Sequence, residues 1–169
     1  MQRFRGFIVS LGLVLTAGSA LADPFVAAPL SGGNEVPANE SKARGIASFQ
    51  LSPDGLQMTY RLVVANIENV VAAHIHVGAA GVNGPVVQFL YGSVPPGGGR
   101  VDGVLAEGTI TAATLAGPLA GRPLSDLIAE MRAGTAYVNV HTNDGVDPAN
   151  TGPGDIPGGE IRAQIRPGS

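Results

Sequence analysis

Glycine and proline divide this chain into short apolar runs, and that division limits the folds open to it. The 169 residues include 25 glycines and 13 prolines, about twice the average share of these two residues. They gather in turn-like clusters such as Ser52-Pro53-Asp54-Gly55, between runs in which apolar and polar side chains alternate. Alternation with a period of two is typical of β-strands with one buried face. The sequence therefore predicts many short strands joined by turns.

Seven or eight segments have this strand pattern: 25–30, 43–51, 56–64, 70–77, 85–90, 104–110, 135–142 and 161–165. Apolar residues recur at helical spacing only from Leu124 to Met131, which predicts one helix from Leu124 to Arg132, ending at Gly134. Ser125 is interpreted as its N-cap. The expected fold class is all-β: an antiparallel, immunoglobulin-like β-sandwich or barrel with one short helix.

The first 22 residues have the pattern of a secretory signal peptide. Arg3 and Arg5 precede an apolar stretch, and Ala20-Leu21-Ala22 has the small-x-small pattern that signal peptidase recognises. Cleavage after Ala22 would leave one domain over residues 23–169. The uncharged segment before the cleavage site is short for a transmembrane helix. We therefore expect an exported protein, periplasmic or extracellular, with no stable membrane anchor after cleavage.

Charge and cysteine content exclude several classes of function. Without Arg3 and Arg5, eight basic and thirteen acidic residues remain, so the mature chain has a net charge of −5. That balance does not attract nucleic acid or an anionic membrane surface. The absence of cysteine excludes thiolate metal sites, iron–sulfur clusters and cysteine nucleophiles. No phosphate loop, dinucleotide fingerprint or nucleophile elbow occurs.

All three histidines of the chain lie in predicted strands. His74 and His76 share one face of the segment 70–77, because strand side chains alternate, and His141 lies near the end of the segment 135–142. In both segments aliphatic residues take the opposite, core-facing side. Three neutral imidazoles that meet outside the core would suit Cu(II), Zn(II) or Ni(II) and would leave a coordination position open. Nitrogens bound to one metal must lie within roughly 4 Å of one another.

A structural role for the histidines, as hydrogen-bonding residues at the rim of a sheet, is an equally open alternative. Copper is the first choice of metal, because imidazole sites favour it in the Irving–Williams order, and zinc is the second. Asp144, Glu160 or water would complete the site. Glu160 and Arg162 are also interpreted as a cross-strand ion pair, of little energetic value if exposed. Glu35 is interpreted as a turn residue.

Five ordered motifs resemble the CHRD domain, which is named after chordin, the extracellular antagonist of bone morphogenetic proteins, and also occurs as a stand-alone secreted domain in bacteria. They lie at residues 30–37 (LSGGNEVP), 73–76 (AHIH), 81–87 (GVNGPVV), 137–142 (YVNVHT) and 159–165 (GEIRAQI). The resemblance implies an immunoglobulin-like β-barrel and export, and it leaves the molecular role open. The segment 143–158 looks like an insertion, interpreted as a flexible acidic loop rather than a cation site formed by Asp144, Asp147 and Asp155.

A looser resemblance links the histidine motifs to copper–zinc superoxide dismutases, in which a His-x-His strand and a later strand supply copper ligands. It implies that His74, His76 and His141 bind copper, but the chain has no other histidine to form a zinc site.

Three hypotheses follow. The favoured one is a secreted, non-enzymatic module that uses the three histidines to bind copper or zinc. The second is an extracellular protein-interaction or adhesion domain with structural histidines. The third is a copper-only, superoxide dismutase-like oxidoreductase.

Overall fold

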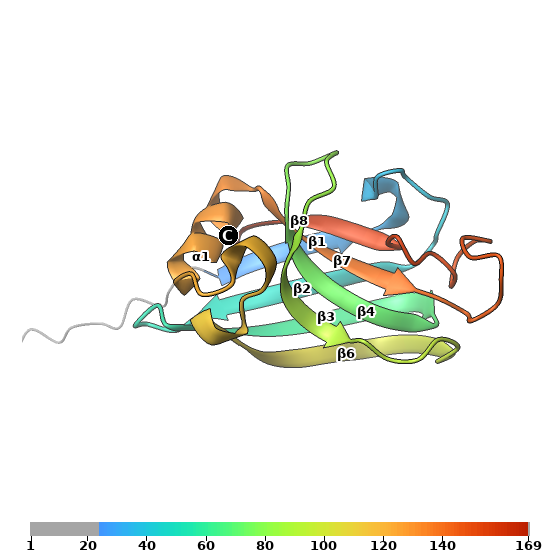
Figure 1. Cartoon of the computed structure of the whole chain (residues 1–169), viewed down its shortest axis with the longest axis horizontal. Helices are drawn as coiled ribbons and strands as arrows, with labels where there is room; N and C mark the ends of the chain where they lie inside the picture. Colours follow the sequence, from blue (N-terminus) through green and yellow to red (C-terminus); the bar gives the residue numbers. More distant parts are fainter. Residues whose placement is uncertain (1–23, 169) are drawn as a thin grey trace, which may run out of the picture.

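The computed structural model describes residues 24–168, which form one antiparallel sheet of eight strands that curls toward a barrel (Figure 1). The strands are β1 (Pro24–Leu30), β2 (Arg44–Leu51), β3 (Gln57–Glu68), β4 (Val70–Val77), β5 (Val86–Gly92), β6 (Arg100–Thr111), β7 (Ala136–Thr142) and β8 (Ile161–Pro167). Their order in the sheet is β5-β4-β7-β8-β1-β2-β3-β6. The two end strands approach each other, and the Tyr60 hydroxyl of β3 donates to the Leu90 carbonyl of β5 at 2.7 Å. The predicted all-β antiparallel fold is confirmed, while the predicted signal peptide lies outside the described residues.

One α-helix, α1 (Leu124–Ala133), packs against β7 and β8, and it is the only α-helix among residues 24–168. It ends at Gly134 in the left-handed conformation, as predicted. Its N-cap is Pro123 rather than Ser125, so the interpretation of Ser125 as the cap was wrong; the fixed φ of proline suits the extended cap position. Three 3₁₀ turns, η1 (Gly32–Asn34), η2 (Ala112–Thr114) and η3 (Gly117–Leu119), were not predicted. In the described part of the chain no helix has the length and apolar character needed to cross a bilayer.

The hydrophobic core lies inside the curled sheet, and the strand alternation determines which residues enter it. Ile75 of β4 and Val138 and Val140 of β7 are fully buried there. The opposite face of β7 is not open to solvent either, because Tyr137 and Asn139 are only 2 % and 4 % exposed. Loops before β2, between β4 and β5, and between β7 and β8 cover this face through polar contacts. The histidines therefore lie within a second, polar layer outside the core.

Candidate metal centre

The pairing of β4 with β7 brings the three histidines together. Figure 1 shows β7 between β8 and β4. In the register of these strands His74 lies opposite Asn139, His76 opposite Tyr137, and Ala72 opposite His141. All three imidazoles therefore project from the same face of one strand pair. The ring centroids are 4.9 Å apart for His74 and His141, 5.6 Å for His74 and His76, and 6.1 Å for His76 and His141.

The nitrogen atoms are close to the spacing that one metal ion requires. The distance from His74 Nδ1 to His141 Nε2 is 3.1 Å, and one nitrogen from each of the three rings lies within 4.8 Å of the other two. Nitrogens bound to one ion at about 2.0–2.1 Å can be roughly 4 Å apart at most. The pair His74–His141 meets this limit, and the bound of 4.8 Å means that no other pair exceeds it by more than about 1 Å. The predicted convergence of the three rings is confirmed.

Backbone carbonyls fix the orientation of two of the rings. The Nδ1–H of His76 donates to the Gly84 carbonyl at 2.9 Å, and the Nδ1–H of His141 donates to the Pro157 carbonyl at 2.8 Å. In each ring Nε2 then carries the lone pair that a metal needs. His76 Nε2 is buried and has no hydrogen-bond partner among the described residues. Such an unsatisfied atom costs about 1–3 kcal/mol, and a bound cation would remove that cost.

The third ring differs, because His74 Nδ1 faces His141 Nε2 directly. With the lone pair on His141 Nε2, the proton between the two rings belongs to His74 Nδ1. His74 would offer this nitrogen to a metal ion only as its other neutral tautomer, in which the proton is on Nε2. Burial lowers the pKa of His74 to about 4, with a further contribution from the charges of His141 and His76. The pKa values of His76 and His141 are also lowered, again mainly by burial. All three rings are therefore neutral near pH 7, the form that binds metals.

Aromatic side chains support two of the three imidazoles. Tyr137 stacks on His76 with ring centroids 4.9 Å apart and an interplanar angle of 8°, and Phe89 meets His74 edge-on at 5.0 Å. The Tyr137 hydroxyl accepts a hydrogen bond from the Gly84 N–H at 3.0 Å, so Tyr137 also holds the residue that orients His76. A Cβ on Gly84 would stand 1.7 Å from the Val77 carbonyl oxygen. This position therefore requires glycine.

Two charged residues were placed wrongly by sequence reasoning. Glu160 and Arg162 do not form the predicted ion pair, and each is only 1 % exposed. Glu160 accepts hydrogen bonds from the hydroxyls of Ser41 and Thr142, both at 2.6 Å, and from the Gly154 N–H at 2.8 Å. The Arg162 guanidinium lies 3.4 Å from the centroid of the Tyr137 ring. The loops that cover β8 separate and bury the two side chains.

Glu35 is a buried group that the sequence interpretation placed in an ordinary turn. Both of its oxygens accept from Asn139 Nδ2, at 2.8 and 3.0 Å. Burial raises the pKa of Glu35 to about 7, although the charge of Arg162 acts in the opposite direction. Asn139 lies opposite His74 in the sheet, so a single residue, Asn139, connects Glu35 to the histidine cluster. Its place in the first CHRD-like motif was the only signal in the sequence.

The segment between β7 and β8 is tied down near the histidines. Pro157 holds His141, as described above, and Asp155 accepts from both the N–H and the hydroxyl of Thr151 at 2.9 Å. Across residues 24–168, the only group of metal-binding side chains that meets the distance criterion is the histidine cluster, with no carboxylate in it. Asp144 and Glu160, the two carboxylates that the sequence suggested as a further ligand, are therefore not brought to the site.

The fold and the site together define an all-β domain that carries three imidazoles on the outer face of a barrel-like sheet. The family model of the CHRD domain matches residues 26–165, which is most of the chain. The chain belongs to the CHRD domain family. No curated protein and no solved structure was found to match it.

Proposed function

We propose that this CHRD-domain protein is an exported metal-binding module in which His74, His76 and His141 bind a copper or zinc ion. The observation that carries the proposal is the cluster of three ring nitrogens within 4.8 Å of one another. Copper is the first choice, because it stands highest in the Irving–Williams order for imidazole ligands. Export rests on the signal-peptide pattern of residues 1–22.

Two features favour metal binding over a purely structural role. The contact between His74 and His141 joins β4 to β7, but these strands are already paired through their backbones. A structural histidine would also be expected to satisfy both ring nitrogens, whereas His76 Nε2 is buried without a hydrogen-bond partner among residues 24–168. A cation at the cluster would account for both features.

Calorimetric titration of the mature chain tests the proposal. The protein, residues 23–169, is prepared without a histidine tag, stripped with a chelator, and titrated with Cu(II) and with Zn(II). We expect one tight site per chain, absent from the triple variant His74→Gln, His76→Gln, His141→Gln. Binding by the wild type that is no tighter than binding by the folded triple variant would reject the proposal.

A matched control distinguishes metal binding at the histidine cluster from metal binding at the acidic loop between β7 and β8. The double variant Asp144→Asn, Asp147→Asn removes two carboxylates from that loop and leaves the histidines intact. We expect this variant to bind Cu(II) and Zn(II) as the wild type does. A loss of tight binding in this variant would show that the metal binds in the loop.

An interaction domain is a second candidate, because an apolar row lies away from the histidines. Ile46 of β2, Val63 of β3 and Val104 of β6 are direct cross-strand neighbours, and Ile46 and Val104 are 44 % and 45 % exposed. An exposed apolar row of this kind suits a protein partner. Under this candidate the histidines are structural, so the triple variant would fail to fold in metal-free buffer, which circular dichroism measures.

A further inference from the structure

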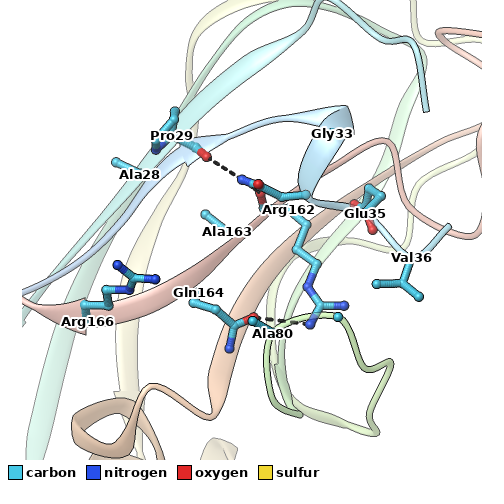
Figure 2. Close-up of a pocket in the computed structure, with 12 residues that line it drawn as sticks. Ala28, Pro29, Gly33, Glu35, Val36, Ala80, Arg162, Ala163, Gln164 and Arg166 are labelled. Carbon is cyan, nitrogen blue, oxygen red and sulfur yellow. Dashed lines mark hydrogen bonds between the residues drawn. The ribbon is translucent and has the colours of Figure 1, made fainter. Parts of the chain in front are cut away.

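A cavity of about 490 Å³ is lined by residues of β1 and β8 and of the loops that follow β1 and β4 (Figure 2). Arg162, Gln164 and Arg166 project into its lining from one face of β8, as the strand alternation requires. Ala28 and Ala80 are small, so they leave much of this space unfilled. The volume lies within the range of roughly 300–1,000 Å³ that is typical of small-molecule sites.

The two arginines give this cavity an excess of positive charge. Arg162 is buried, and the acceptors of its guanidinium are all neutral: the carbonyls of Ala79 and Val82 and the side-chain oxygens of Asn83 and Gln164, at 2.9–3.2 Å. The three ion pairs among residues 24–168 include neither Arg162 nor Arg166. The carboxyl in the lining is Glu35, whose pKa is raised to about 7, so its negative charge is incomplete near neutral pH. The charges of Arg162 and Glu35 attract each other, but two guanidiniums and one carboxyl in the lining still leave the cavity with an excess of positive charge.

The backbone of the cavity wall is open to a ligand. Apart from the adjacent residues in the chain, no described residue has an atom within 4 Å of the position that a Cβ would take on Gly33 or on Gly81, and both glycines line the cavity. A ligand can therefore approach the main chain closely at two points. The Arg166 side chain is exposed and makes no hydrogen bond or ion pair with any described residue, whereas its backbone pairs with Val26 of β1. Its planar guanidinium is therefore available to a carboxylate.

We propose that this cavity binds a small organic anion through a carboxylate group, with Arg166 as the direct ligand and Arg162 as the fixed positive charge behind it. A guanidinium can hold a carboxylate by two parallel hydrogen bonds, which fixes its orientation as well as its position. The inference does not depend on metal binding, because none of the cavity residues belongs to the histidine cluster.

Calorimetric titration of the metal-free mature protein with succinate and with citrate tests the inference. The ionic strength is held at about 0.15 M, so that exposed charges are screened. Succinamide serves as the neutral isostere of succinate, and inorganic phosphate serves as the competing oxyanion. We expect saturable binding of at least one carboxylate and none of succinamide. No binding of either carboxylate, equal binding of succinamide, or tighter binding of phosphate would overturn the inference.

Substitutions test whether the anion binds in the cavity. Arg166→Gln removes the direct ligand and should weaken binding roughly tenfold or more. Arg132→Gln makes the same change of charge at an exposed arginine of α1, and it should bind as the wild type does. Equal weakening in both variants would show general attraction to positive charge and would refute the site.

A third variant tests the cavity without changing any charge. Gly33→Leu extends a side chain into open space and should abolish binding by filling the cavity. Unchanged binding in the folded variant would refute this location. If the variant does not fold, the comparison of Arg166→Gln with Arg132→Gln decides the question.

Discussion

The stability of the metal-free protein should reflect two groups, the partly buried His74 and the buried Glu35, that respond to acid in opposite directions. The pKa of His74 falls from 6.5 to about 4 on folding, so its contribution is complete above pH 6.5 and is lost as the pH falls through 4. The pKa of Glu35 rises from 4.5 to about 7, so its contribution is complete below pH 4.5 and is lost as the pH rises through 7. Between pH 4.5 and 6.5 the two effects oppose each other.

The contribution of each group to the free energy of unfolding follows from the shift of its pKa on folding. Both shifts are 2.5 units, and one unit corresponds to about 1.36 kcal/mol, so each is worth about 3.4 kcal/mol at most. His74 is only partly buried, and solvent screening reduces its share to about 1–2 kcal/mol. His76 and His141 act in the same direction as His74. The wild type should therefore vary less in stability between pH 4.5 and 6.5 than it would if only one of the two groups titrated.

Two substitutions should separate the opposing effects. Glu35→Gln cannot titrate but keeps an oxygen acceptor for Asn139, so its free energy of unfolding should fall by about 1–2 kcal/mol or more from pH 6.5 to 4. His74→Gln should become more stable than it is at pH 7 as the pH falls toward 4.5, because the effect of Glu35 then dominates.

Urea denaturation followed by circular dichroism, in chelator and at a series of pH values, measures these free energies. A Glu35→Gln profile that superimposes on the wild type would show that the Glu35 carboxyl does not hold its proton in the folded state. A His74→Gln profile that matches the wild type would show that the ring is not held neutral. Either result would refute the account of burial given above.

Three further predictions concern the histidine cluster. Long-range ¹H–¹⁵N spectra of the metal-free protein should show His76 and His141 as Nδ1–H tautomers. Addition of Zn(II) should remove the Nδ1 proton of His74. An Nε2–H signal from His76 would contradict the tautomer assigned to that ring. Gly84→Ala should weaken metal binding about 10–100-fold in calorimetric titration, because its Cβ would overlap the Val77 carbonyl oxygen and displace the Gly84 carbonyl that orients His76. Unchanged affinity would show that the Gly84 carbonyl does not support metal binding by His76. Free metal at 100 times its dissociation constant should raise the free energy of unfolding by about 2.7 kcal/mol, reversibly with chelator, and a shift of equal size in the triple glutamine variant would place the metal elsewhere.

The sequence predicted well those properties that depend on neighbouring residues. The side chains of His74 and His76 share a face because strand geometry alternates over two residues, and Val138 and Val140 enter the core for the same reason. Turn clusters and helical spacing likewise predicted nearly every strand and the end of α1 at Gly134.

Long-range packing was harder to predict, as the outer face of the sheet shows. Sequence reasoning placed this face outside the core, but it did not predict that loops distant in the chain bury Tyr137, Asn139 and Arg162 there. It also treated Glu35 as a turn residue, although Glu35 meets Asn139 across more than a hundred residues of chain. No local pattern reports such a contact, since the side chains involved are polar and resemble exposed ones.

By itself the sequence determined the strands, the face on which each histidine projects, and membership of the CHRD family, because each is set by residues close together in the chain or by motifs in a fixed order. Only the tertiary structure decided that β4 pairs with β7, so that His74 meets His141, and that loops enclose the rings. Strand pairing depends on the packing of the whole sheet, and the pKa values of the histidines depend on that enclosure.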